Sequence, residues 1–534
     1  MAKSTALTNS GQAPFRAAEC CWTRRQTSDR TTLPASFPGR EDGLKKRICA
    51  LFLALLVSAP FGGATIAIAQ SSGTFTPVGN MTASRAQHSA TLLPDGRVLI
   101  AGGSSSGSSM LASTEFYDPN AGTFRAGASM ITARRMHTAT LLPDDRVLLV
   151  GGYGLRDALA NAELFDPVTG TFSATGNLID ARGGHTALLL STGKVLIVGG
   201  YGTNTYPNVA PAELYDPASG TFASAGPYVG RGGCDFCAPS ILLSDGTVLF
   251  PGQYPAQLYD PARDAFSPIG MMIHDPSTAA PLRNGQVLFA GGESVGRSAD
   301  AELYSPATRT FVSTGSMASR RVWHTLSLLP NGMVLAAGGE TDSCSGSGCW
   351  FAGSLATAEL YDPSAGVFLP AGSMAAARET HTSTVLTDGR VLVAGGVSYG
   401  GIGIFGGSLG SAELYSPDVL VAGPALVSVS GNGGGQGAVF HAGTTHLAAP
   451  DDPAAVGESV DVYCTGLTTG SVIPPQIAIG GRMAAVLGVS TVPGAAGVNQ
   501  VRVRVPSGIA PGPSVRVRMT YVDRPSNTVT MAVR

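Results

Sequence analysis

The sequence predicts an all-β protein in which a seven-bladed β-propeller precedes a smaller β-sandwich. Three observations carry this prediction. A unit of about 40 to 57 residues recurs seven times, a period typical of propellers and other repeat arrays. Glycine accounts for 71 of the 534 residues while only 13% are charged, which favours short strands joined by tight turns. After the last unit the repeat stops, and segments of alternating polarity begin.

Each unit predicts four antiparallel strands, which is the blade of a propeller. In the first unit an apolar segment follows His88, and an Asp-Gly turn leads into a second apolar segment that ends at the doublet Gly102-Gly103. A third segment ends in Tyr117-Asp-Pro, and Thr-Phe opens the fourth. We expect the doublet to lie where backbones approach too closely for a side chain. It recurs at Gly151-Gly152, Gly199-Gly200, Gly291-Gly292, Gly338-Gly339 and Gly395-Gly396, and as Pro251-Gly252 in the fourth unit.

The count of fourth strands predicts how the ring closes. The seventh unit ends at Tyr415-Ser-Pro417 with no Thr-Phe after it, whereas an extra Gly73-Thr-Phe75 precedes the first unit. We therefore expect the strand around Phe75 to complete the blade that contains Tyr415. This pairing would cover an exposed sheet edge.

The repeat resembles the kelch family, over roughly 340 residues in seven copies. The shared features are the doublet, the Tyr-Asp-Pro step and an aromatic in the fourth strand, where this chain has Phe and many kelch repeats have Trp. The resemblance implies a kelch propeller over residues 70–420. Secreted kelch propellers with a C-terminal sandwich are similar to the galactose and glyoxal oxidases. Their copper site includes an adjacent Tyr-His pair, and this chain contains no Tyr-His dipeptide.

Residues 424–534 predict a second domain. Segments of alternating polarity, such as 459–463 and 501–505, are separated by Pro and Gly turns, which is typical of a half-buried antiparallel sandwich. The stretch from Gly437 to Gly508 resembles a C-terminal domain common in secreted acidobacterial proteins. That resemblance implies an Ig-like or transcription-factor-Ig-like (TIG-like) sandwich without a catalytic role.

The N-terminal residues predict export. We interpret the polar residues 1–43 as a disordered or mis-called extension. Residues 44–69 carry three basic residues at 45–47, continue as an apolar run and end in Ala67-Ile-Ala69, which is the pattern of a signal peptide cleaved after Ala69. The alternative is a membrane anchor, because about 20 apolar residues can span a bilayer, but Pro60 interrupts the run. We expect a mature protein that is secreted, periplasmic or on the cell surface.

Cleavage of this leader would leave five cysteines. Export favours disulfides, so the close pairs Cys234/Cys237 and Cys344/Cys349 predict two local bridges, with Cys464 free. Two cysteine pairs are also a zinc pattern. Because the pairs lie in different units, we expect no metal site.

A motif Arg-x-x-His precedes the first strand in five units, and a Glu lies in the third strand of six. In the fifth unit His274 takes the arginine position. The arginines are Arg85, Arg134, Arg182, Arg321 and Arg378, and the histidines are His88, His137, His185, His324 and His381. The glutamates are Glu115, Glu163, Glu213, Glu302, Glu359 and Glu413.

Two interpretations of this motif stay open. A residue present in nearly every repeat usually builds the repeat, with His bonding a neighbouring blade and Glu pairing with Arg. Alternatively, the arginines ring the channel mouth and bind a carboxylate, phosphate or acidic peptide. Strand alternation places their loops on the face with the long insertions 201–211, 340–357 and 397–411, which we call the rim face. The opposite face, with the Asp-Gly and Asp-Pro turns, we call the turn face. We predict a binding site on the rim face that consists of the five arginines with Trp350 and Phe351.

Together these features predict an exported scaffold that binds a glycan or protein partner, possibly acidic, through one propeller face. The alternative is a carbohydrate-active enzyme, either of the kelch sugar-epimerase type, with His or Glu moving protons, or of the copper-oxidase type. No single acid–base pair stands out, so we favour binding over catalysis and expect no cofactor. The net charge of −2 gives no electrostatic basis for binding nucleic acid. We expect a monomer without a membrane span after cleavage.

Overall fold

The structure, a computed structural model, describes residues 73–534 except for 106–108, 203–210, 227–239, 252–254, 295, 346–347, 401–405 and 468–470. Its regular elements are all β-strands. The predicted extension and leader lie outside the described residues, as do Cys234 and Cys237. Within the described ranges, no helix has the length and hydropathy that crossing a membrane requires.

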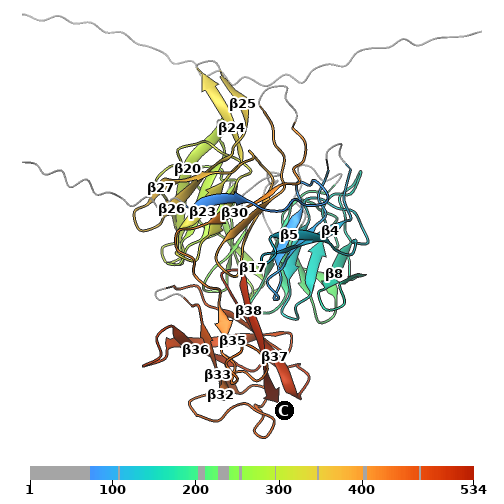
Figure 1. Ribbon diagram of the computed structural model, residues 1–534, viewed down its shortest axis with the longest axis vertical. Coiled ribbons are helices and arrows are strands. Elements are labelled where there is room, and N and C mark those ends of the chain that lie inside the picture. The colour runs from blue at the N-terminus through green and yellow to red at the C-terminus, as the bar shows by residue number, and fades with distance from the viewer. Residues whose placement is uncertain are drawn as a thin grey trace, which may run out of the picture. The chain divides into compact units, whose positions relative to one another are not determined.

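Seven four-stranded antiparallel sheets form the propeller, which confirms the predicted fold class (Figure 1). Blades 1 to 3 consist of β2 (Ser89–Leu92), β3 (Val98–Ala101), β4 (Thr114–Asp118) and β5 (Thr123–Ala126); β6 (Thr138–Leu141), β7 (Val147–Val150), β8 (Ala162–Asp166) and β9 (Thr171–Ala174); and β10 (Thr186–Leu189), β11 (Val195–Val198), β12 (Glu213–Asp216) and β13 (Thr221–Ser224).

Blades 4 to 7 repeat the arrangement, and the first strand of each blade lines the central channel. They consist of β14 (Ile241–Leu242), β15 (Val248–Phe250), β16 (Gln257–Asp260) and β17 (Ala265–Pro268); β18 (Thr278–Pro281), β19 (Val287–Ser294), β20 (Gly296–Ser305) and β21 (Thr310–Ser313); β22 (Thr325–Leu328), β23 (Val334–Ala337), β26 (Thr357–Asp362) and β27 (Val367–Ser373); and β28 (Thr382–Val385), β29 (Val391–Ala394), β30 (Ala412–Ser416) and β1 (Thr74–Pro77).

The apolar core of the propeller lies between neighbouring blades. In blade 1 every residue of the second strand, β3, is buried, which explains its continuous Val-Leu-Ile-Ala sequence. Tyr117, at the end of β4, is fully buried and packs on Phe124 of its own blade with ring centroids 5.0 Å apart. It belongs to the same apolar cluster as Leu392 of blade 7. The recurring aromatic therefore fills the space between two blades.

The glycine doublet lies where backbones approach too closely for a side chain, as the sequence predicted. Gly102 and Gly103 both have positive φ angles, 65° and 94°. A Cβ on Gly102 would lie 2.5 Å from the carbonyl oxygen of Arg134 in the next blade, and one on Gly103 would lie 2.6 Å from that of Ala86. At Gly102 the backbone of the next blade, and at Gly103 the loop before β2 of the same blade, comes so close that only glycine fits.

The N-terminal strand closes the ring. β1 pairs antiparallel with β30, and Phe75 lies opposite Tyr415 with ring centroids 5.0 Å apart. In Figure 1 this blue strand lies beside β30 of the last blade. The predicted closure is confirmed, and Tyr415 is fully buried because of it.

The C-terminal residues form a nearly closed, sandwich-like sheet of eight strands in the order β31-β33-β36-β35-β34-β37-β38, with β32 beside β33. Alternate residues of β33 and β36, such as Val460 and Val503, fill its core. The strands are β31 (Ala425–Leu426), β32 (Val439–His441), β33 (Ser459–Thr465), β34 (Gln476–Ile479), β35 (Arg482–Thr491), β36 (Val498–Arg504), β37 (Gly512–Tyr521) and β38 (Arg524–Val533).

The sandwich contacts the turn face of the propeller. Arg518 of β37 donates from Nη2 to the carbonyl oxygen of Leu142 at 2.9 Å and forms an ion pair with Asp145. Arg516 Nη1 lies 3.0 Å from the same carboxylate. Because Leu142 and Asp145 belong to the turn between β6 and β7, part of the turn face is covered by the chain's own second domain.

Candidate functional site

The repeated arginines lie inside the blades. Arg85 Nη2 is 2.7 Å from Glu115 Oε1, while Nη1 donates to the carbonyl oxygens of Gly102 and Ser113 at 2.8 and 3.0 Å. Glu115 also accepts the N–H of Thr82 at 2.7 Å. The same ion pair joins Arg134 to Glu163, Arg182 to Glu213, Arg321 to Glu359 and Arg378 to Glu413, at 2.6–2.8 Å.

All five arginine side chains are 0% exposed. Each one ties the loop before the first strand to the end of the second strand and to the third strand. A ligand on the rim face would find no exposed guanidinium among them. This geometry favours the structural interpretation of the motif, and the rim surface must be built from other residues.

The motif histidines connect neighbouring blades. His88 Nε2 lies 2.9 Å from Thr382 Oγ1 in blade 7. Burial, and secondarily the nearby motif arginines, lowers the pKa of His88, His185 and His381 to about 3, so these rings are neutral. Equivalent bonds join His137 to Ser89, His185 to Thr138 and His381 to Thr325.

Blade 5 carries a substitute for the Arg–Glu pair. His274 Nδ1 lies 3.2 Å from Glu302 Oε1, as its place in the repeat suggests. Burial lowers the pKa of His274 and raises that of Glu302, which favours a neutral pair over an ionic one. The corresponding Arg231 of blade 4 lies outside the described residues.

The blades differ from one another at two positions on the rim face. In each of five blades an isolated bridge joins the residue after the motif arginine to the residue after the doublet. The bridged pairs are Ala86–Ser104, Arg135–Tyr153, Gly183–Tyr201, Val322–Glu340 and Glu379–Val397. The buried Arg–Glu pairs and motif histidines form a framework that repeats from blade to blade. The two bridged positions, in contrast, hold different types of residue in almost every blade.

A row of strained residues, called a ring below although it spans only blades 6, 7, 1 and 2, lies next to these bridges. Gln87, Met136, Trp323 and Thr380, each directly before a motif histidine, have φ angles of 50–57°. Met136 N donates to Gln87 O at 2.9 Å, and Gln87 N donates to Thr380 O at 3.2 Å, so the ring runs from blade to blade. Non-glycine residues in this conformation cost roughly 1–3 kcal/mol each, and such strain gathers at binding sites.

On blades 1 to 3 the rim is cationic and aromatic. Arg135 Nη1 donates to Gln87 Oε1 at 2.6 Å, and its guanidinium lies 5.9 Å from the ring centroid of Tyr153. Tyr153 Oη donates to the carbonyl oxygen of Tyr201 at 3.3 Å. The half-exposed Arg135 thus offers the positive charge that the buried Arg134 beside it does not.

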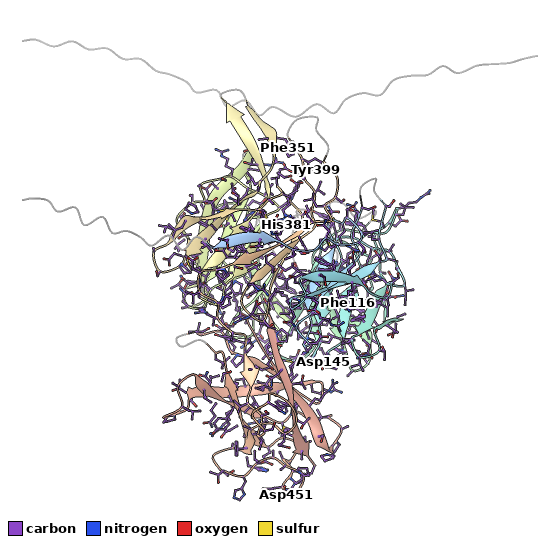
Figure 2. All side chains as sticks on the ribbon, viewed as in Figure 1. Phe116, Asp145, Phe351, His381, Tyr399 and Asp451 are labelled. Atoms are coloured by element: carbon purple, nitrogen blue, oxygen red, sulfur yellow. The ribbon has the colours of Figure 1, made fainter. Side chains whose placement is uncertain are left out.

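On blades 6 and 7 the long insertion forms a β-hairpin, β24 (Glu340–Ser345) and β25 (Gly348–Ser354). Its register places Cys344 opposite Cys349, which is compatible with the predicted disulfide. The bridge stays a prediction, because these side chains and that of Trp350 lie outside the described part. The ring of Phe351 meets that of Tyr399 edge-on at 5.7 Å, and both are labelled near the hairpin in Figure 2.

Buried carboxyls anchor this hairpin. Glu340 and Glu379 are 4% and 2% exposed, and Arg297 forms an ion pair with Glu340. Ser354 Oγ donates to Glu379 Oε2 at 3.1 Å and accepts the N–H of Tyr399 at 3.0 Å. Burial, followed by the nearby Glu340, raises the pKa of Glu379 to about 8. Glu379 is therefore mainly protonated at neutral pH.

Sequence reasoning missed Arg135, Tyr153 and Glu379 because it gave most weight to residues that recur. These residues could have been found by looking for positions of the repeat that vary instead of positions that recur. Within an aligned repeat, positions that change from blade to blade are not needed for the blade itself. Polar and aromatic residues at such positions are candidates for recognition.

Comparisons with known proteins show the fold. No family model matches the chain, and no curated protein matches it. Among solved structures, the chain is similar to a fungal alcohol oxidase of the AA5 family, in complex with copper, with a TM-score of 0.57 and 17% identity. The similarity covers 86% of this chain and 99% of that one. At this identity it establishes a shared galactose oxidase-like propeller fold.

The described residues give no indication of a metal site built from histidine, cysteine or carboxylate side chains. Across the described ranges, no three or more His, Cys, Asp or Glu side chains gather in a way that could hold a metal ion. Four of the motif histidines, His88 and His137 among them, have their Nε2 atoms bonded to hydroxyls of neighbouring blades.

Proposed function

We propose that this chain is an exported binding protein whose rim face engages a protein or glycan partner. The observation that carries the proposal is the contrast between a repeated buried framework and a rim that differs in almost every blade. Selection for the fold alone would not require Arg135 with Tyr153 in one blade and Ala86 with Ser104 in another. Export is supported by the leader pattern in residues 44–69.

The rim face and the turn face differ in how much of their surface is accessible to a partner. The sandwich covers part of the turn face through Arg518 and its bonds to Leu142 and Asp145. The rim face carries the hairpin β24–β25 and the strained ring that includes Met136 and Thr380. Loops on one face of a rigid scaffold are the usual place for recognition.

Exposed apolar side chains favour a protein partner. Leu155, Ile131 and Ile179 are 76%, 61% and 58% exposed, and all three lie in rim-face loops of blades 2 and 3. They occur with the cation of Arg135 and the aromatic ring of Tyr153. Apolar, aromatic and arginine side chains together are typical of the centre of a protein interface.

The proposal is tested with residues 70–534 on protein and glycan arrays, followed by affinity measurement by surface plasmon resonance. Leu155→Ser and Arg135→Ala should each weaken binding by about tenfold or more, because interface anchors of these types carry much of the affinity. Phe351→Ala tests whether the hairpin takes part.

The matched control is Val168→Ser, which changes a side chain that is 82% exposed in a turn of blade 2 on the opposite face. Asp95→Ala is a second turn-face control. Loss of affinity in these variants with full binding in Leu155→Ser and Arg135→Ala would show that the functional face is the other one. Turnover of an acidic sugar by the protein would support the enzyme interpretation instead.

A further inference from the structure

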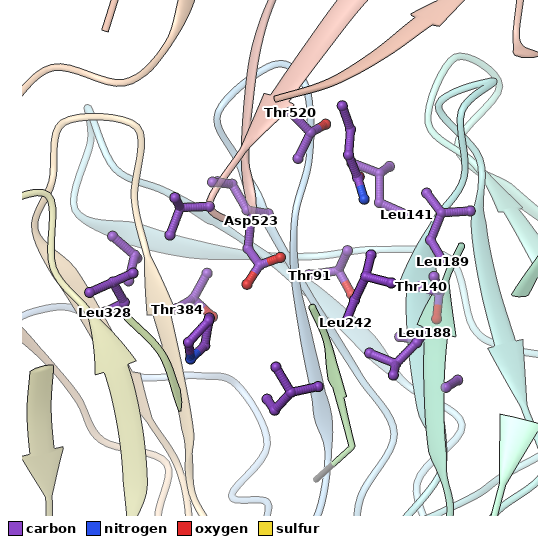
Figure 3. A pocket seen from close by; sticks show the side chains of 18 of the residues that line it. Thr91, Thr140, Leu141, Leu188, Leu189, Leu242, Leu328, Thr384, Thr520 and Asp523 are labelled. Atoms are coloured by element: carbon purple, nitrogen blue, oxygen red, sulfur yellow. The ribbon is translucent and has the colours of Figure 1, made fainter. Parts of the chain in front are cut away.

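The tip of the hairpin β37–β38 lies in the central channel of the propeller. β37 and β38 are joined by the two residues Val522 and Asp523, which line a channel cavity together with residues of all seven first strands. Figure 3 shows Asp523 between Thr91 of β2 and Thr384 of β28. The cavity has a volume of about 470 Å³.

This tip is held in a defined but unusual conformation. Val522 and Asp523 have φ angles of 50° and 57°, the left-handed turn that two-residue hairpins use and that Asn-Gly fills most easily. A valine and an aspartate at these positions are not explained by the turn. Arg518 fixes one strand of the hairpin on Leu142, and Arg524 Nη1 donates to the carbonyl oxygen of Val421 at 3.2 Å.

The carboxylate of Asp523 has no hydrogen-bond or ion-pair partner among the described residues. Among the described residues, one other charged side chain, that of Arg518, lines the cavity, and it is paired with Asp145. Water in the channel can reach Asp523, although protein atoms surround it on every side. Burial accordingly raises the pKa of this carboxyl.

The walls around Asp523 combine hydroxyls with aliphatic groups. Thr140 and Thr384 lie among alanines and leucines of the first strands. Thr91 is 8% exposed, and its buried Oγ1 has no hydrogen-bond partner within the described structure. An unused buried hydroxyl near an unpaired carboxylate indicates that the cavity is equipped for more hydrogen bonds than the protein itself makes.

A second cavity of about 550 Å³ meets the first at Asp523. It lies between turns of the propeller, such as that at Ser244, and residues of the sandwich, such as Pro474 and Met483. Val522 and Thr520 also line both cavities. The two spaces are therefore adjacent at the tip of the hairpin.

We propose that the channel binds a small organic ammonium ion, with its charge on Asp523 and its carbon chain against the apolar walls. The class follows from the lining. Divalent cations take six to eight oxygen ligands and usually several carboxylates, whereas this site has one. A cavity of about 470 Å³ lies in the range of small-ligand pockets, far larger than a bare ion needs. This proposal is independent of the function proposed for the rim face.

The test uses n-butylammonium chloride as the probe and n-butanol as its neutral counterpart, with binding to residues 70–534 followed by saturation-transfer NMR and calorimetry. We expect saturable binding of butylammonium and weaker binding of butanol. Asp523→Asn should weaken butylammonium binding by about tenfold or more and leave butanol unaffected. Asn tolerates the left-handed conformation as well as Asp does, so the hairpin should be preserved.

The control variant is Asp451→Asn, which removes an exposed carboxylate from the same sandwich and should change nothing. Absence of saturable binding would overturn the proposal. Equal affinity of the two probes, or of wild type and Asp523→Asn for butylammonium, would overturn the role of the charge. Displacement of butylammonium by an equal concentration of potassium would make the site one for a metal ion.

Discussion

At the scale of single residues, adjacent positions of this chain have opposite roles. Arg134 recurs in five blades, is fully buried and pairs with Glu163, whereas Arg135 occurs once, is half-exposed and lies beside Tyr153. The sequence showed which arginines repeat but not which way they point. In an extended loop, consecutive side chains point in opposite directions, and only the packed neighbour decides which one is buried.

Removing one partner of the buried Arg134–Glu163 ion pair should destabilise the protein strongly, whereas replacing both partners should destabilise it much less. Arg134→Met leaves the Glu163 carboxylate buried without its cation and should lower the free energy of unfolding by about 3–5 kcal/mol, measured with urea. The double variant Arg134→Met/Glu163→Gln should recover much of this loss, because no buried charge remains. As a control, Arg97→Met breaks an exposed pair with Asp95 and should cost about 1 kcal/mol or less. Equal costs for Arg134→Met and Arg97→Met would contradict the structural role.

At the scale of elements, the strands and their turns were predictable, and two hairpins were not. The Asp-Gly and Asp-Pro turns of the repeat mark the blade strands directly. The insertion β24–β25 is rich in Gly, Ser and Cys and lacks the alternation that signals a strand, so it was expected as a loop. The Val522–Asp523 tip lacks the Asn-Gly or Asp-Gly pair that marks a tight hairpin turn, so its entry into the channel could not be predicted from the sequence.

The closing strand β1 should contribute strongly to stability. Deleting residues 73–79 exposes Tyr415 and the edge of β30, and should lower the free energy of unfolding by about 4 kcal/mol or more. Differential scanning calorimetry measures the change. A synthetic peptide of residues 73–79 added to the shortened protein should restore part of the loss, whereas a peptide with Phe75→Ser should not. A melting curve unchanged by the deletion would argue against closure by this strand.

At the scale of the whole molecule, neutral histidines bond neighbouring blades at four junctions of the described propeller. Burial lowers the pKa of His88, His185 and His381 to about 3 and that of His137 and His324 well below the ordinary value of 6.5. The unfolded chain takes up these protons near pH 6.5, whereas the folded chain takes up those of His88, His185 and His381 only at about pH 3 and those of His137 and His324 also well below pH 6.5. Their contribution to stability is therefore complete above pH 6.5 and is lost as the pH falls through this window.

These histidines predict cooperative unfolding in acid. Each histidine should lower the free energy of unfolding by about 1.4 kcal/mol per pH unit below 6.5. With five such histidines, stability should fall steeply as the pH decreases. His185→Gln, which can still bond Thr138, should move the acid midpoint down by roughly half a pH unit in a circular dichroism titration. His446→Gln removes a histidine that is 73% exposed and should leave the midpoint unchanged. Identical midpoints for wild type and His185→Gln would contradict the role of these histidines.

The pairing of β1 with β30 also sets an order of events during synthesis. Thr74 lies opposite Ser416, so the first strand of the propeller to emerge is the last to be placed. Six blades can assemble before β1 is paired, and until then β30, once synthesised, has an unpaired edge. The strand β1 of another copy of the chain can pair with this edge of β30 in the same register. Crowded nascent chains are thus exposed to strand exchange, in which two molecules complete each other's rings, until the seventh blade has formed.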